Sequence, residues 1–299
     1  MKIFIVGVSG CLGQNLTKLA ISKDYEVFGI SRSLYEYNSP NFSFYQCDAK
    51  NKTELAKALK LAKPDVVVNT SAKTNVDACE DEREDAIETN VGIVKNLAEL
   101  CGSAIPLIQI STDYVFDGDS APYTESSKPN PQGFYGETKH QAEEFLQKSN
   151  CIWSVLRTQI LFGNGKNLKA DFVSWLLKSL KNNSPVKIVT DQIGNPTLAS
   201  QLAKGILAVI ERKPYNEILH CSGREGINRY EFSLIAAEIF GLDKSLISPV
   251  TSSEFKQKAK RPANSTFKTN YSEKALGFEF LNPKETLLAY QKEIETESI

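Results

Sequence analysis

Histidine is scarce in this sequence, and neither positive nor negative charge is in large excess. Only two of the 299 residues are histidines, His140 and His220, and neither has a companion at the spacing of metal ligands. A structural zinc site or a histidine-based catalytic triad is therefore not expected, and we predict no metal. The net charge is −1, without a long run of either sign. This balance argues against a protein that binds nucleic acid or a membrane surface.

Long apolar runs and paired cysteines are absent too. No stretch approaches the roughly 18 apolar residues of a membrane span, so no membrane partner is expected. The N-terminal MKIFIVGVSG breaks into glycine and serine after a short apolar run, which favours a buried first strand over a secretory signal. The six cysteines are scattered, with no C-x-x-C pair. Reduced thiols and a cytoplasmic location are therefore expected.

Short β-branched runs alternate with helical stretches through the first half of the chain. The runs cover residues 2–7, 26–31, 65–70, 106–111 and 153–158, with candidate helices between them. They are almost continuously apolar, as in strands that are buried on both faces. The sequence therefore predicts an α/β fold, a doubly wound parallel sheet of Rossmann-like type.

The alternation loosens after about residue 160, where turn-rich segments surround isolated strands. A chain of 299 residues is long enough for two unequal domains. We predict a dinucleotide-binding and catalytic domain over residues 1–160 and a smaller mixed α/β substrate domain over 161–299. Chain from about 197–222 is expected to return to the first domain.

Three glycines follow the first predicted strand. Gly7, Gly10 and Gly13 in GVSGCLG stand between that strand and the first predicted helix. Glycine permits the tight turn and the close backbone approach that a pyrophosphate needs, and a helix N-terminus favours the anion. The pattern predicts dinucleotide binding, and a glycine-rich turn without a ligand is the alternative.

The end of the second predicted strand bears on the choice of dinucleotide. Ser31 and Arg32 lie about 20 residues after the glycine loop, where an acid would bind the ribose 2′-hydroxyl of NADH. No acid is present and a guanidinium suits a 2′-phosphate, so NADPH is favoured while NADH stays possible. Arg32 could otherwise be an ordinary surface residue. Asp48, after the short strand FSFYQC, could reach the adenine or simply form a turn.

A hydroxyl and a tyrosine–lysine pair mark the other end of the expected crevice. Thr112 and Asp113 follow the fifth strand, and strand C-termini line the ligand crevice of an open parallel sheet. Tyr135, with Lys139 four places on, is the only tyrosine in the chain followed at that spacing by a basic residue. One helical turn apart, the two side chains face the same way. An exposed helix without a catalytic role is the alternative.

Longer motifs are spread over nearly the whole chain. They are GVSGCLGQNL, ISTDYVFDG, GFYGETKHQAEE and VLRTQILFG in the first half, and DQIGNPT, LHCSG and RPANS in the second. As a set they resemble the extended short-chain dehydrogenases/reductases, and within them the dTDP-4-dehydrorhamnose reductase family. The resemblance implies an NAD(P)H-dependent oxidoreductase that reduces the C4 ketone of a nucleotide-linked 4-keto-6-deoxy sugar. Its first candidate reaction is dTDP-4-dehydrorhamnose to dTDP-rhamnose.

The resemblance implies three catalytic residues. Tyr135 would donate a proton to the developing alkoxide. Lys139 would lower the pKa of that phenol from its ordinary value near ~10, and would also hold the nicotinamide ribose. Thr112 would hydrogen-bond the carbonyl oxygen, with Asp113 close to the sugar.

The family's ligand contacts also map onto this chain by position. The implied cofactor contacts are Gly7, Gly10, Cys11, Leu12, Gly13, Ser31, Arg32, Asp48, Ala49, Ala72, Lys73, Thr74, Tyr135 and Lys139. The implied substrate contacts are Thr112, Asp113, Tyr135, Ile160, Gln192, Asn195 and Arg261. For the last three, loop hydrogen bonds or surface charge are equally good explanations.

Two places depart from the family pattern. Gln159 and Ile160 stand where an aromatic residue often faces the sugar, and Lys73 stands where an aromatic residue or histidine is common. Both departures bear on the substrate pocket, so they leave the sugar open. The alternatives are another nucleotide-sugar reductase or epimerase, or a regulatory subunit resembling the β subunit of methionine adenosyltransferase. A homodimer is possible, with the acidic stretch 79–88 at its interface or, alternatively, in solvent.

Overall fold

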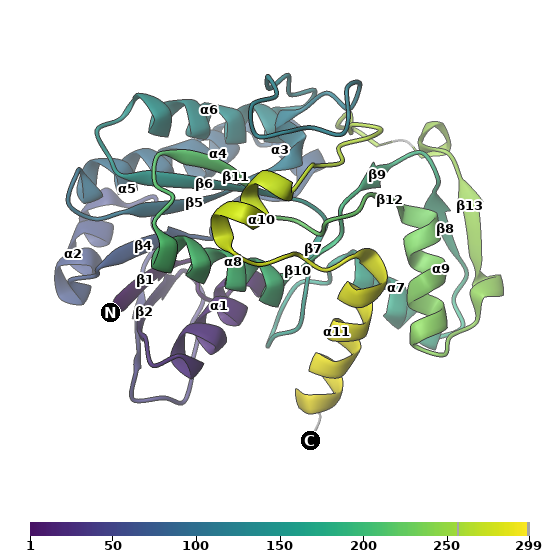
Figure 1. The fold of residues 1–299 in the computed structure, drawn as a ribbon, viewed down its shortest axis with the longest axis horizontal. Coiled ribbons are helices and arrows are strands. Elements are labelled where there is room, and N and C mark those ends of the chain that lie inside the picture. Colours follow the sequence, from purple (N-terminus) through teal and green to yellow (C-terminus); the bar gives the residue numbers. More distant parts are fainter. Residues whose placement is uncertain (256, 298–299) are drawn as a thin grey trace.

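A seven-stranded parallel sheet forms the centre of the protein (Figure 1). The computed structural model describes residues 1–255 and 257–297, and the strands run in the order β11-β6-β5-β4-β1-β2-β3. Their bounds are β1 Lys2–Val6, β2 Glu26–Ser31, β3 Phe42–Gln46, β4 Val66–Asn69, β5 Leu107–Thr112, β6 Trp153–Thr158 and β11 Glu217–His220. All neighbouring pairs in this sheet are parallel. The predicted doubly wound α/β fold is confirmed.

Alternation within the strands explains the two helical layers. In β1, Ile3 and Ile5 belong to the core that faces α1 and α8. Phe4 and Val6 belong to the opposite core, which faces α2, α5 and α6. Successive strand side chains point to opposite faces, so a strand with helices on both sides is apolar at every position. The helix bounds are α1 Cys11–Ser22, α2 Lys52–Ala62, α5 Ile93–Cys101, α6 Phe134–Lys148 and α8 Ala199–Arg212.

Later chain builds a smaller mixed unit beside the sheet, on the right in Figure 1. In it, β8 (Val186–Val189) pairs with β13 (Ile247–Val250), and β9 (Ile193–Gly194) pairs with β12 (Ile227–Asn228). Its helices are α7 Phe172–Lys181, α9 Arg229–Ile239 and α11 Pro283–Glu297. Phe232 of α9 and Leu287 of α11 meet in a core separate from the two that flank the sheet.

Part of the later chain returns to the sheet. β11 pairs with β6 at the sheet edge, α8 packs on α1, and α10 (Asn270–Leu276) packs on α8 and β11. β7 (Leu161–Phe162) pairs with β10 (Thr197–Leu198) between the two parts. Residues before and after position 160 together build the sheet and one of its helix layers. The predicted domain boundary after residue 160 therefore stays a prediction.

Several short elements complete the fold. They are α3 Val76–Asp81, α4 Arg83–Ile87, the π-helical segment η1 Glu88–Gly92, and the 3₁₀ turns η2 Asp113–Val115, η3 Lys244–Leu246 and η4 Ser252–Glu254. Among the described residues, none of the helices is long and apolar enough to cross a bilayer.

Candidate active site

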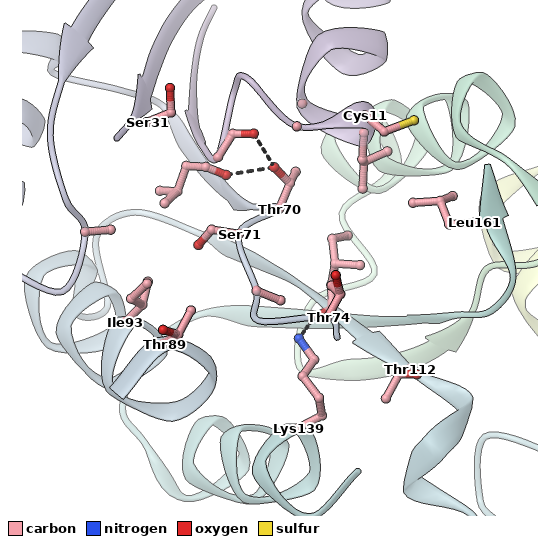
Figure 2. A pocket seen from close by; sticks show the side chains of 18 of the residues that line it. Cys11, Ser31, Thr70, Ser71, Thr74, Thr89, Ile93, Thr112, Lys139 and Leu161 are labelled. Atoms are coloured by element: carbon pink, nitrogen blue, oxygen red, sulfur yellow. Dashed lines mark hydrogen bonds between the residues drawn. The ribbon is translucent and has the colours of Figure 1, made fainter. Parts of the chain in front are cut away.

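A cavity of about 560 Å³ opens at the carboxyl ends of the strands (Figure 2). It spans the point between β1 and β4 where the strand order reverses, which is where open α/β sheets bind ligands. Its size lies within the roughly 300–1,000 Å³ of small-molecule sites. The glycine loop lines one part of it, and Thr112, Tyr135 and Lys139 line another.

The glycine loop leaves its backbone open to a ligand. Gly7 has a φ of +83° and donates its N–H to Ile30 O at 2.9 Å, which turns the chain sharply after β1. A Cβ on Gly13 would lie 2.4 Å from the Gly7 carbonyl oxygen, so only glycine lets α1 begin this close to the loop. Within the described residues, no side chain caps the first turn of α1. Its N–H groups are available to a phosphate, so this cradle fits a dinucleotide.

β5 and α6 bring the predicted catalytic residues together. Thr112 ends β5, and Tyr135 and Lys139 lie on the first two turns of α6. The Lys139 ammonium donates to Ile110 O at 2.6 Å, which holds it beside the sheet (Figure 2). Thr112 hydrogen-bonds the Tyr135 phenol and donates to Asp113 Oδ1 at 3.0 Å. A hydroxyl, a phenol, a carboxyl and an ammonium therefore share one end of the cavity.

Two polar side chains fix α6 in this position. Glu80 of α3 accepts the Phe134 N–H at 2.8 Å, so a negative charge lies at the N-terminus of the helix. Asn90 of η1 donates to Thr138 Oγ1 at 2.9 Å and accepts the Lys73 N–H at 2.8 Å. π-helical segments are frequent at functional sites. The position of Asn90 beside α6 was not predicted, because nothing in the sequence ETNVG indicates a π-helical turn.

Burial decides the charges of the catalytic cluster. It lowers the pKa of Lys139 to about 8, although Glu143 favours the charged form. It raises the pKa of Asp113 to about 6, against hydrogen bonds from Ser265 and Thr112. Both groups titrate near neutral pH, as is common at functional sites. Across residues 1–255 and 257–297, no group of three or more potential ligands is arranged to hold a metal ion.

The expected lowering of the Tyr135 pKa by Lys139 is not found. Burial raises the pKa of Tyr135, and the hydrogen bond with Thr112 opposes this shift. Asp113 raises the pKa further, because a nearby negative charge disfavours a phenolate. The Lys139 ammonium is committed to the Ile110 carbonyl instead. The phenol is thereby kept protonated, as a proton donor requires.

Most predicted cofactor residues line the cavity. Those that do are Gly7, Gly10, Cys11, Leu12, Gly13, Ser31, Arg32, Asp48, Ala49, Ala72, Thr74, Tyr135 and Lys139. Figure 2 shows Cys11 and Ser31 on the side away from Thr112 and Lys139. Asp48 Oδ1 also accepts the Lys50 N–H at 3.0 Å, so the turn that was the alternative for this residue is formed as well.

Lys73 is turned away from the cavity, although its neighbours Ala72 and Thr74 line it. Its ammonium pairs with the carboxylates of Glu82 and Asp85. These partners raise the pKa of Lys73, and hydrogen bonds from Lys73 and Lys50 lower that of Asp85 to about 2. The Lys73 side chain is therefore held in an ion-pair cluster with Glu82 and Asp85, and the predicted cofactor contact of this residue stays a prediction.

Two predicted substrate residues are tied into the fold. Asn195 is fully buried, donates to Gly223 O at 2.7 Å and accepts the Phe267 N–H at 3.0 Å. Its amide oxygen and nitrogen are therefore both used in hydrogen bonds inside the protein. Gln192 donates to Ser252 Oγ at 2.9 Å and does not line the cavity. For both residues the structure matches the alternative of loop hydrogen bonds.

Two arginines bring positive charge near Tyr114, which lines the cavity. Arg261, also predicted, does not line the cavity, and its guanidinium pairs with both oxygens of Asp77 at 3.1 and 2.8 Å. Arg229 begins α9, with its guanidinium 4.7 Å from the ring centroid of Phe172. Both interact electrostatically with Tyr114, a cavity residue. The position of Arg229 near the cavity was not predicted, because an arginine at the start of a helix is usually a surface residue.

Ile160 holds a strained backbone at the cavity wall. Its φ is +45°, which is rare for a β-branched residue and is concentrated at functional sites. Its carbonyl accepts the Thr197 N–H at 3.2 Å, which ties β7 to β10. Ile160 lines the cavity, where we predicted a substrate contact.

A buried ion pair supports the catalytic cluster from behind. Glu143 of α6 accepts two hydrogen bonds from Arg157 of β6, at 3.0 and 2.6 Å. Ser111, next to Thr112 in β5, donates to the same carboxylate at 2.5 Å. Sequence spacing alone could not find this pair, because its members lie on different elements.

The chain is similar to known proteins over nearly its full length. The family described as RmlD substrate binding domain matches residues 1–295. A dTDP-4-dehydrorhamnose reductase of Aggregatibacter actinomycetemcomitans is 31% identical over 293 residues, which are 93% of this chain and 94% of that one. The methionine adenosyltransferase 2 subunit beta of Xenopus tropicalis is 32% identical over 257 residues, 84% of this chain and 75% of that one. The solved dTDP-4-dehydrorhamnose reductase of Bacillus anthracis in complex with NADP is 26% identical, with a TM-score of 0.88 over 98% of this chain and 99% of that one. The chain therefore belongs to the RmlD substrate binding domain family, among the extended short-chain dehydrogenases/reductases.

Proposed function

We propose that the protein is an NADPH-dependent reductase of a nucleotide-linked 4-keto-6-deoxy sugar, with dTDP-4-dehydrorhamnose to dTDP-rhamnose as the first candidate reaction. One observation carries the proposal: a single cavity joins the glycine cradle to the buried Thr112, Tyr135 and Lys139. The relatives named dTDP-4-dehydrorhamnose reductase support the substrate class.

The proposed chemistry divides between the cofactor and three side chains. When bound, NADPH supplies the hydride. Tyr135 donates its proton to the ketone oxygen as that atom becomes an alkoxide, which is a stronger base than a phenolate. Thr112 orients the same oxygen. Lys139, with a pKa of about 8, is mostly charged at neutral pH, so its ammonium can bind the hydroxyls of the nicotinamide ribose.

The remaining ligand contacts follow the shape of the cavity. N–H groups of the glycine loop and the first turn of α1 bind the pyrophosphate. Arg32 binds the 2′-phosphate and Asp48 lies at the adenine, and the solved relative that holds NADP supports this choice of cofactor. Asp113 and Ile160 lie beside the sugar. Asn195 and Gln192 are left out of the substrate contacts, because their side chains bind other parts of the protein.

Replacing the proposed proton donor tests this function. Purified protein is mixed with NADPH and dTDP-4-dehydrorhamnose, and oxidation of the nicotinamide is followed by absorbance. We expect Tyr135→Phe to lower kcat by roughly 10²–10⁴-fold, the usual contribution of a general acid. NADPH affinity should change little. Tyr45→Phe, which removes a phenol that hydrogen-bonds Glu54 and does not line the cavity, is the matched control. Wild-type protein that binds NADPH but reduces no 4-keto nucleotide sugar would contradict the proposal.

A regulatory role is the second candidate, because a methionine adenosyltransferase 2 subunit beta is as similar to this chain as the reductase is. In that case the protein would bind NADPH, turn over no keto sugar and form a complex with a methionine adenosyltransferase. Size-exclusion chromatography of the two purified proteins distinguishes the two functions.

A further inference from the structure

A second cavity adjoins the end of the main cavity where the adenosine would lie. It measures about 350 Å³ and shares Ser9 and Ser33 with the main cavity. Ser33 follows Arg32, the residue that sequence analysis assigned to a 2′-phosphate. The far wall is formed by Lys166, from the loop that follows β7. This loop is more than 130 positions away from Arg32 in sequence, which is why sequence spacing could not connect the two.

The backbone of Lys166 is fixed by a side chain of α1. The Lys166 N–H donates to Gln14 Oε1 at 2.8 Å, and Gln14 Nε2 donates back to the Lys166 carbonyl at 2.8 Å. Gln14 is buried and also donates to Ser9 O at 2.8 Å, so the same amide binds both walls of the second cavity. A second contact, from Asn15 to Asn164 O at 2.9 Å, secures the loop. Lys166 is therefore held next to the cofactor site by hydrogen bonds to its backbone, which leaves its side chain available.

The charges around this cavity are not balanced within the protein. In the part of the chain that the structure describes, neither Arg32 nor Lys166 has a carboxylate within ion-pair distance. Glu36 lines the second cavity as an opposing charge. Arg32 lines the main cavity beside the shared Ser33, and Lys166 lines the second cavity. Two cations at adjoining cavities are suited to a doubly charged phosphate, and one acid limits how strongly they bind it.

We propose that Lys166 is a specificity residue for the cofactor: together with Arg32 it binds the 2′-phosphate of an adenine dinucleotide where the main cavity meets the second one. This inference rests on the proposed function, because it assumes that a dinucleotide occupies the main cavity. It assigns the discrimination between NADPH and NADH to two separate segments, the end of β2 and the loop after β7. Glu36 weakens that discrimination.

Binding measurements with both dinucleotides test the assignment. Dissociation constants for NADPH and NADH are measured by fluorescence titration at low salt, without any sugar substrate. Lys166→Gln should raise the Kd for NADPH about tenfold, the effect of losing one charge-assisted contact, and leave the Kd for NADH within about twofold. Glu36→Gln should have the opposite sign and tighten NADPH binding. Lys166→Arg should retain the preference.

Lys169→Gln is the matched control, since Lys169 lies in the same loop but lines neither cavity. If Lys166→Gln and Lys169→Gln weaken NADPH binding equally, general surface charge explains the effect and the proposal is wrong. It is also wrong if Lys166→Gln weakens NADPH and NADH binding alike. Wild-type protein that binds neither dinucleotide would overturn the proposed function itself, a result that differs from both.

Discussion

Lys139, a proposed catalytic residue, shows what the burial of a charge does to stability. Only 3% of its surface is exposed, and burial lowers its pKa from 10.5 to about 8. One pKa unit corresponds to 1.36 kcal/mol, so the folded state disfavours this ammonium by about 3 kcal/mol relative to water. Its hydrogen bond to Ile110 O offsets about 1 kcal/mol of that at most. The buried Lys139 ammonium therefore lowers the free energy of unfolding, as charged groups in active sites commonly do.

We predict that Lys139→Met stabilises the folded protein by about 2 kcal/mol near neutral pH, while abolishing turnover. Below about pH 8 the lysine is charged in both states and the full penalty applies. Between about pH 8 and 10.5 the unfolded chain binds more protons than the folded one, so wild-type stability rises with pH and the advantage of the variant shrinks.

Urea unfolding at about pH 7 and about pH 10 measures this difference. Lys148→Met, at the exposed end of the same helix, should show no such pH dependence. An advantage of Lys139→Met that is equal at both pH values would disprove the titration of Lys139 assigned here.

At the scale of elements, α6 and β6 depend on one buried ion pair. Glu143 is 0% exposed and Arg157 1%, and the carboxylate accepts hydrogen bonds from Arg157 and Ser111. Removing one partner leaves the other charge buried without compensation, which typically costs about 3–5 kcal/mol. We therefore predict this loss of unfolding free energy for Glu143→Gln.

Denaturant unfolding of three proteins checks the ion pair. Glu144→Gln changes the next residue of the same helix, which is exposed, and should alter stability by no more than about 0.5 kcal/mol. Glu143→Leu combined with Arg157→Met removes both charges and should recover most of the lost stability. Equal effects of the Glu143 and Glu144 variants would rule out a stabilising role for the pair.

At the scale of the whole molecule, one face of the sheet depends on the later chain. Leu202 and Ile206 of α8 share a core with Ile3 and Ile5 of β1. A fragment of residues 1–160 lacks α8 and β11, so this apolar face would be in water. We predict that the fragment does not fold cooperatively and binds an apolar dye such as ANS, as partly packed states do.

Co-expression of residues 161–299 with this fragment should restore a cooperative transition and abolish dye binding. The intact chain is the reference. A sharp urea transition from the fragment alone would mean that residues 1–160 fold independently of the chain that returns to the sheet.

Much of the sheet follows from local sequence. The predicted runs 26–31 and 153–158 coincide with β2 Glu26–Ser31 and β6 Trp153–Thr158, because strands covered on both faces must be apolar throughout. Two-residue strands such as β7 and β9 are too short to show an apolar run in the sequence. They are defined only by their pairing with β10 and β12, which are distant in sequence. The position of β11 at the sheet edge is likewise decided by pairing with β6.

Sequence by itself determined the glycine loop, the Tyr135–Lys139 spacing and the parallel sheet, because each depends on neighbours within a few residues or on a continuous apolar run. Tertiary structure alone decided which polar groups are free to meet a ligand. The fold brought Asp85 to Lys73 and Asp77 to Arg261, and it placed Gln14 where it fixes the loop of Lys166. Burial likewise decided the protonation of Tyr135 and Lys139, since desolvation depends on how the whole fold encloses a side chain.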